Sequence, residues 1–254
     1  MNDIRYARIY LMGTMAQMII ICLIIAILRT NAIQYPKILE IIFLIIGGSS
    51  SALWGIIISL KAKRAESLHR IIKDFFKIKQ SVRHYGIVAL FILIIFGFQF
   101  FTGSFLDGTK WYSFFVFFIV AIVFGGIEEI GWRYTFQPII EQKVTFGIAS
   151  TITFVSWCIW HYMYFYLTDS LQSIQHISFI IGLLGSSFGL GAIYYISNSL
   201  WLCVLYHCLL NVFSQTMMVN DLKIVIVCNA VCIILSIVMV KGRGDNNACS
   251  TAKS

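Results

Sequence analysis

Residues 9–28 read IYLMGTMAQMIIICLIIAIL, a run of twenty positions without a charged side chain. About 20 apolar residues are what a helix needs to cross the hydrocarbon core of a bilayer. Over all 254 residues, 59% are hydrophobic and only 12% are charged, about half the charged share of soluble domains. A water-soluble domain of this size has no core large enough to hide so much apolar surface. The composition therefore excludes a soluble enzyme, a disordered chain and a disulfide scaffold, and it indicates an integral membrane protein.

Seven further apolar segments follow the first one along the chain. Continuous runs of this length favour membrane-spanning helices over the short alternating strands of a β-barrel. We therefore expect an all-α, polytopic membrane protein, a single domain over residues 1–254 with a bundle of about eight transmembrane helices. The expected spans are Ile9–Leu28, Ile38–Leu60, Tyr85–Phe105, Trp111–Arg133, Ile148–Leu167, Ile177–Ile196, Leu200–Val219 and Leu222–Val240.

The distribution of Lys and Arg predicts the orientation. With eight crossings both termini lie on the same side, and 15 of the 19 Lys and Arg residues then fall on that side. Positive charge marks the cytoplasmic face of membrane proteins. We expect a multi-pass protein of the plasma membrane with cytoplasmic N and C termini.

Residues 61–84 form the only sizeable predicted loop, and its eight Lys and Arg residues outnumber its two acidic residues. Apolar side chains recur in it at helical spacing, at Leu68, Ile71, Ile72, Phe75 and Phe76. This pattern predicts a basic amphipathic helix on an anionic inner leaflet. The plainer interpretation is that the loop only satisfies the positive-inside rule. In either case topology accounts for the basic excess, and we expect no nucleic-acid partner.

Ionisable side chains inside the predicted spans are functional candidates, because burying them in a membrane costs free energy. Glu128 and Glu129 lie in the fourth span, and adjacent residues of a helix point about 100° apart. Glu129 and Arg133 share one helix face, so we expect Arg133 to neutralise Glu129 near the inner end of the helix. Glu128, without that partner, is a candidate general base. A charged collar at a helix end is the alternative.

His161 lies in the fifth span, and His207 and Asn211 share one face of the seventh. If the fifth helix begins near Ser150, these groups and Glu128 lie at comparable depth in the inner half of the membrane. Each alone fits a structural hydrogen bond between packed helices. Together, a base candidate, two imidazoles and an amide are what hydrolysis of a bond inside the membrane requires.

Three motifs in order carry a resemblance to a known family: EExxxR at 128–133, a [FW]xxxH at 157–161 and HxxxN at 207–211. The chain resembles the CAAX-processing and bacteriocin-processing membrane proteases (CPBP, also called Abi) over residues 111–213, the expected catalytic core. Three positions depart from the common pattern: Tyr134 in place of Gly, Trp157 in place of Phe and Cys203 in place of Pro.

The resemblance implies an intramembrane endopeptidase, a peptide hydrolase dependent on glutamate. Glu128 would activate a water that His161 orients, and His207 with Asn211 would stabilise the oxyanion. Glu129 and Arg133 would mainly support the site. The family favours a mechanism without metal or other cofactor. A zinc site formed by Glu128, His161 and His207 is the lower-ranked alternative.

The substrate implied by the resemblance is a membrane-associated peptide or protein tail: a prenylated CAAX-type tail, a peptide pheromone or a bacteriocin precursor. Two other functions compete with proteolysis. One is a non-catalytic immunity or signalling scaffold of the same fold. The other is a small-solute transporter. The sequence has no pair of interrupted hydrophobic segments at matching positions in its two halves, and this counts against a transporter.

Overall fold

The computed structural model describes residues 3–218 and 221–251, with the side chains of residues 4–218 and 221–243. Helices make up most of the described chain. Its only strand-like pairing is an isolated bridge between Phe105 and Met217. The elements are α1 (Asp3–Thr30), α2 (Lys37–Gly48), α3 (Ser50–Lys61), α4 (Leu68–Phe75), α5 (Val82–Thr102), α6 (Ser113–Ala121), η1 (Ile122–Gly126), α7 (Glu128–Gly131), η2 (Trp132–Phe136), α8 (Gln137–Glu141), α9 (Phe146–Leu167), η3 (Leu171–Ser173), α10 (His176–Ser197), α11 (Leu200–Thr216) and α12 (Leu222–Thr251).

The all-helical membrane fold is confirmed. Within the described residues, six helical stretches are long and apolar enough to cross a bilayer: Ile4–Thr30, Lys37–Lys61, Val82–Thr102, Ser113–Glu141, His176–Ser197 and Leu222–Arg243. The other two predicted spans also lie on helices, α9 and α11. Helix α11 is shorter, with 17 residues, and α9 has 22 residues but is not in the set of six.

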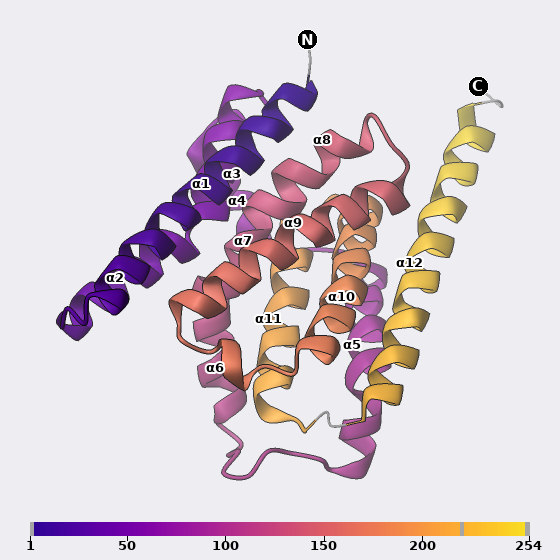
Figure 1. The fold of residues 1–254 in the computed structure, drawn as a ribbon. Coiled ribbons are helices and arrows are strands. Elements are labelled where there is room, and N and C mark those ends of the chain that lie inside the picture. The colour runs from indigo at the N-terminus through magenta and orange to yellow at the C-terminus, as the bar shows by residue number, and fades with distance from the viewer. Residues whose placement is uncertain (1–2, 219–220, 252–254) are drawn as a thin grey trace.

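The two described ends of the chain lie at the same end of the bundle (Figure 1). Helices α1, α2 and α3 form one flank, and α5 and α12 form the opposite one, with α9, α10 and α11 between them. Helix α10 packs along α12, and α11 packs against the fourth span. Residues from the fourth, fifth and seventh predicted spans therefore meet in the middle of the bundle.

The fourth span is not a regular α-helix. Two π-helical turns, η1 and η2, flank the single α-helical turn α7 that carries both glutamates. π-Helical turns inside helices are frequent at functional sites. The helix also continues through α8 to Glu141, so the expectation that it ends near Arg133 is wrong. Glu128 lies about 20 Å from that end, close to the middle of the span.

Glycines bring the second and fourth spans into backbone contact. A Cβ atom on Gly55 of α3 would lie 2.6 Å from the Cα of Gly131 in α7, so neither helix could approach as closely with a larger residue. At this crossing the hydroxyl of Ser51 donates a hydrogen bond to the backbone carbonyl of Glu128, 3.1 Å away. The catalytic candidate is thus anchored to α3 by its main chain.

Helix α4 in the basic loop differs from the expected surface helix. Ile71 and Phe75 are buried in a core cluster with Tyr134, Leu200 and other residues, so this part of the apolar face packs on protein rather than on lipid. The other apolar side chains, at positions 68, 72 and 76, stay exposed. The helix therefore forms part of the bundle while it keeps a free apolar edge.

Candidate active site

Glu128 is buried between α7 and α9, with 3% of its surface exposed. The indole Nε1 of Trp157 donates a hydrogen bond to its Oε2 across 2.7 Å. Among the described residues, no hydrogen bond reaches the other carboxylate oxygen, Oε1. The main chain of Glu128 is held by Ser51, whose hydroxyl lies 2.8 Å from that of Tyr10. The carboxylate therefore has one fixed oxygen and one that is free to bind a substrate or a water.

Glu129 is fully buried and faces a different helix from Glu128. Its Oε1 lies 2.7 Å from Nδ1 of His207 and 3.6 Å from Nη1 of Arg133. The expected ion pair between Glu129 and Arg133 is present, but the imidazole is the nearer partner. The two adjacent glutamates thus bind two different helices, α9 and α11, as a separation of about 100° on one helix allows.

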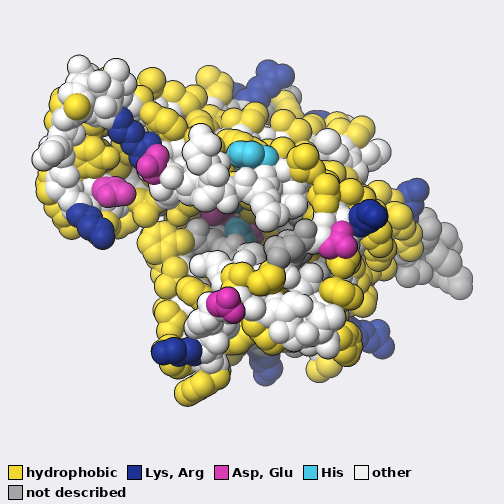
Figure 2. Space-filling view, turned by 60° about the horizontal axis from the view of Figure 1, so that its bottom comes forward, with side chains coloured by type: hydrophobic (Ala, Val, Ile, Leu, Met, Phe, Trp, Pro, Cys, Tyr) yellow, Lys and Arg dark blue, Asp and Glu magenta, His cyan; other side chains and the backbone are white. Residues whose placement is uncertain are grey.

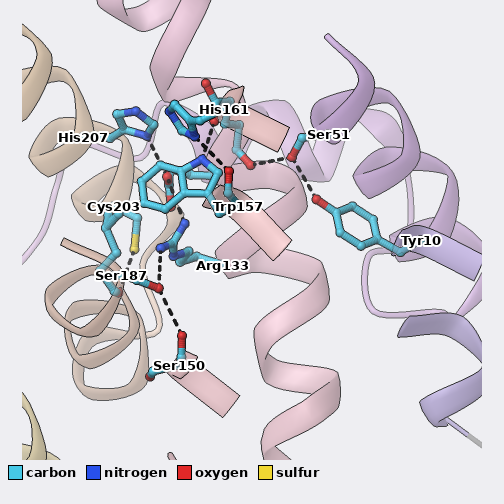
Figure 3. Close-up of polar contacts among 12 residues, drawn as sticks. Tyr10, Ser51, Arg133, Ser150, Trp157, His161, Ser187, Cys203 and His207 are labelled. Carbon is cyan, nitrogen blue, oxygen red and sulfur yellow. Dashed lines mark hydrogen bonds and ion pairs between the residues drawn. The ribbon is translucent and has the colours of Figure 1, made fainter. Parts of the chain in front are cut away.

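Arg133 lies beneath the indole of Trp157, with its guanidinium carbon 4.3 Å from the ring centre. Its Nη2 donates to the hydroxyl of Ser187, which donates in turn to the backbone carbonyl of Ser150. Cation–π contacts with Trp are favourable, and more so away from water. Figure 3 shows the indole between this guanidinium and the two imidazoles of His161 and His207.

His161 is oriented by its own helix. Its Nδ1 lies 3.0 Å from the backbone carbonyl of Trp157. A carbonyl only accepts, so Nδ1 carries the proton, and Nε2 of the neutral ring is left with a lone pair. The centres of both imidazole rings lie close to that of Trp157, at 5.0 Å for His161 and 5.4 Å for His207.

A cavity of about 250 Å³ lies between α5, α9, α10, α11 and α12. Trp157, His161, His207 and Asn211 are among its lining residues, together with apolar residues such as Phe179 and Leu183. Glu128 does not line it and stands behind Trp157. The structure therefore brings three of the four predicted catalytic residues to one space, and places the fourth in contact with one wall of that space.

The surroundings of Gly125 in η1 show where the side-chain nitrogens of Asn211 and His207 point. A methyl group at this position would collide with Nδ2 of Asn211 and would lie 3.1 Å from Nε2 of His207. Both nitrogens therefore point to the same spot beside the backbone of the fourth span. Only a residue without a side chain leaves this spot open.

The cavity does not lie in the half of the bundle next to the termini, where the sequence predicts it. It lies in the opposite half. Helix α9 begins at Phe146 rather than near Ser150, so His161 is about 22 Å along it. The lining residues come from the middle of the helices and from the ends opposite the termini, such as Ser178 and Ile224. Figure 2 looks onto this end and shows a hollow at its centre with a histidine side chain at depth.

Within the described chain, the candidate site does not have the side-chain arrangement of a metal site. The described residues include no group of three or more His, Cys, Asp and Glu placed to hold one metal ion. Glu128 and both histidines each use one polar atom on a protein partner, as described above. The zinc ligand set considered from the sequence is therefore not assembled in this conformation.

Two residues of the site have roles that the sequence did not predict. The N–H of Trp157, at a position where the resemblance leads us to expect Phe, holds the carboxylate of Glu128. Asn229 of α12 is 3% exposed and lines the cavity, and its Oδ1 has no hydrogen-bond partner among the described residues. A polar residue in the last apolar span was the available signal for Asn229.

A known protein family matches the segment of the chain that carries the candidate site. Residues 109–213 match the family model described as Type II CAAX prenyl endopeptidase Rce1-like. The matched segment contains all six predicted catalytic and supporting residues. No curated protein matches the chain.

Proposed function

We propose, since residues 109–213 match the Rce1-like family model, that this chain is an intramembrane endopeptidase that hydrolyses a membrane-associated peptide or protein tail. One observation carries the proposal: His161, His207 and Asn211 line one cavity, and Glu128 is bonded to Trp157 in its wall. The substrate classes that this family resemblance favours are a prenylated CAAX-type tail, a pheromone precursor and a bacteriocin precursor.

In the proposed reaction Glu128 takes a proton from a water as the water attacks the scissile carbonyl, and it returns this proton to the amine nitrogen when the C–N bond breaks. Glu128 is the proposed base, since its Oε2 is fixed by Trp157 and its Oε1 is free of protein partners in the described chain. Nε2 of His161, which carries the lone pair, accepts a hydrogen bond from the same water and orients it. General bases positioned in this way contribute about 10² to 10⁴ in rate.

The negative charge that develops on the carbonyl oxygen needs donors fixed in advance. Nδ2 of Asn211 and Nε2 of His207 converge beside Gly125 and are the proposed donors. With a proton on each ring nitrogen, His207 donates from Nδ1 to Glu129 and from Nε2 to the oxyanion. Preorganised donors of this kind are worth more in a low-dielectric site than in water.

Glu129 and Arg133 are proposed positioning residues. Glu129 fixes the ring of His207, and Arg133 supports the indole that holds Glu128. No step of this mechanism uses a metal ion or another cofactor. The walls formed by Phe179, Leu183 and neighbouring apolar residues suit an apolar segment of a peptide.

The test compares Glu128→Gln with the unaltered chain in cells that express each at equal level. Glutamine keeps an oxygen to accept the bond from Trp157 but loses the basicity of the carboxylate. Membrane-associated peptides are then identified by mass spectrometry. We expect at least one precursor to accumulate with E128Q, with cleavage reduced about 10² to 10⁴-fold.

Glu40→Gln is the matched control, because Glu40 is exposed on α2, away from the cavity. It should process the precursor like the unaltered chain. Full processing by E128Q would overturn the proposal. A biological effect that survives both Glu128→Gln and His161→Ala would favour the non-catalytic scaffold instead.

A further inference from the structure

A second cavity lies at the end of the bundle that carries the termini, remote from the candidate active site. It has a volume of about 600 Å³ between the basic loop, the end of α10 and the start of α11. Its lining is mostly polar and includes three cationic side chains, two tyrosines and an amide: Arg64, Arg70, Lys77, Tyr134, Tyr194 and Gln80. The proposed peptidase activity makes no use of these groups.

The charges around this cavity leave a cationic excess. Glu66 and Asp74 also line it, but Asp74 already accepts hydrogen bonds from Arg70, at 3.0 Å, and from the hydroxyl of Tyr134, at 3.1 Å. The bond to Asp74 raises the pKa of Arg70. Lys77 and Arg64 share the cavity with the exposed Glu66, and Arg64 also lies within range of the carboxylate of Glu141. Nε of Arg64 is buried and has no hydrogen-bond partner among the described residues.

The start of α11 adds to the positive potential. Ser199 and Leu200 line the cavity, and α11 begins at Leu200 and runs for 17 residues. The hydroxyl of Ser199 already accepts a hydrogen bond from the N–H of Leu202. The remaining N–H groups of the first turn and the positive end of the helix dipole favour anions. Cationic side chains and this helix end face the same space.

The helix that forms one wall of the cavity also has an exposed apolar edge. Leu68, Ile72 and Phe76 recur at every fourth residue through α4 and the residue after it, and about half of each is exposed, from 48% to 56%. At about 100° per residue, this edge lies on the side of α4 opposite to Arg70 and Asp74, which line the cavity. An apolar edge beside cationic residues is how a helix lies in the headgroup region of a leaflet. With this edge in the headgroup region, the cavity on the other side of α4 lies at a similar depth, near the phosphate groups of the leaflet.

We propose that this cavity is a binding site for the phosphate group of an anionic phospholipid headgroup. Arg64 and Lys77 would contact the phosphate oxygens, with the start of α11 behind them. The exposed apolar edge on the opposite side of α4 would hold the helix at the depth of the headgroups. A soluble phosphate has the same chemistry, so the experiment has to separate the two sources.

Purified full-length chain in a neutral detergent is titrated with phosphatidylglycerol, with phosphatidylcholine and with inorganic phosphate. Bound lipid is counted by native mass spectrometry, and the melting temperature is followed in parallel, since a ligand of the folded state raises it. We expect phosphatidylglycerol to bind roughly tenfold more tightly than phosphatidylcholine. Inorganic phosphate at equal concentration should leave the melting temperature unchanged.

The double variant Arg64→Gln with Lys77→Gln should lose this preference, with affinity for phosphatidylglycerol reduced roughly tenfold. The matched control is Lys73→Gln with Lys79→Gln, which removes the same charge from the same loop outside the cavity lining. It should bind like the unaltered chain. If the first double variant fails to fold, Lys77→Gln alone takes its place, with a smaller loss.

Equal losses in both double variants would overturn the proposal in favour of a diffuse surface attraction. Stabilisation by inorganic phosphate equal to that by phosphatidylglycerol would overturn it in favour of a soluble ligand. Neither result bears on the peptidase proposal, because the measurement does not involve cleavage.

Discussion

The indole of Trp157 and the carboxylate of Glu128, both buried, are joined by a 2.7 Å hydrogen bond. An indole has a single N–H and cannot accept, so this bond uses its whole hydrogen-bonding capacity. The bond also fixes which oxygen of Glu128 stays free. In this chain the tryptophan at the position where the family commonly has phenylalanine therefore has a distinct role.

Replacing Trp157 with phenylalanine removes this donor and keeps an aromatic ring. We expect the rate of cleavage at saturating substrate, kcat, to fall about 10- to 100-fold, the equivalent of one lost hydrogen bond to a charged group. KM should change little, because the ring still forms the wall of the cavity. Steady-state kinetics on the precursor identified with E128Q would measure both.

Trp201→Phe is the control for this variant. The indole of Trp201 also donates one hydrogen bond, to the hydroxyl of Tyr85, but it lies outside the cavity lining. It should leave kcat unchanged. A W157F protein with the kcat of the unaltered chain would show that the bond to Glu128 is only structural.

Much of the fold could be predicted from the sequence, because the thickness of a bilayer dictates the length of an apolar run. Helical spacing likewise predicted that His207 and Asn211 share a face. The two π-helical turns beside Glu128 could not be predicted, since a shift in backbone hydrogen bonding leaves no trace in an apolar composition. The depth of the site could not be predicted either, because it depends on where α9 begins, and an apolar run does not define the first residue of a helix to within a turn.

Gly125 tests the convergence of the two proposed oxyanion donors. Gly125→Ala would place a methyl group against Nδ2 of Asn211 and Nε2 of His207, so both must move. We expect activity to fall on the order of a hundredfold, the usual result of displacing a catalytic group by about 1 Å. Gly97→Ala is the control, since a Cβ there meets nothing within 4 Å. Equal activity of the two variants would contradict the assignment of His207 and Asn211 as donors.

Chelation tests the absence of metal from the mechanism. In the described structure Nδ1 of His161 and Nδ1 of His207 are bonded to protein oxygens, and no three-residue ligand group is assembled. We expect cleavage to persist after treatment with 1,10-phenanthroline followed by dialysis into metal-free buffer. Loss of activity that added zinc restores would instead establish the Glu128, His161 and His207 zinc site.

The side on which the active-site cavity opens follows from two separate observations. The cavity lies toward the end of the bundle opposite the termini, and the positive-inside rule predicts that the termini are cytoplasmic. Together they predict a cavity that is open to the outside of the cell. Cys228 lines this cavity, and Ser67 is exposed in the basic loop at the other end.

A chain with Cys228 as its only cysteine should react with a membrane-impermeant maleimide on intact cells. A second chain, in which Ser67→Cys supplies the only cysteine, should react only after the cells are permeabilised. The reverse pattern would place the termini outside, because the two positions lie at opposite ends of one bundle. Failure of Cys228 to react under either condition, while the Ser67→Cys chain does react, would contradict a cavity that is open to reagents from the outside.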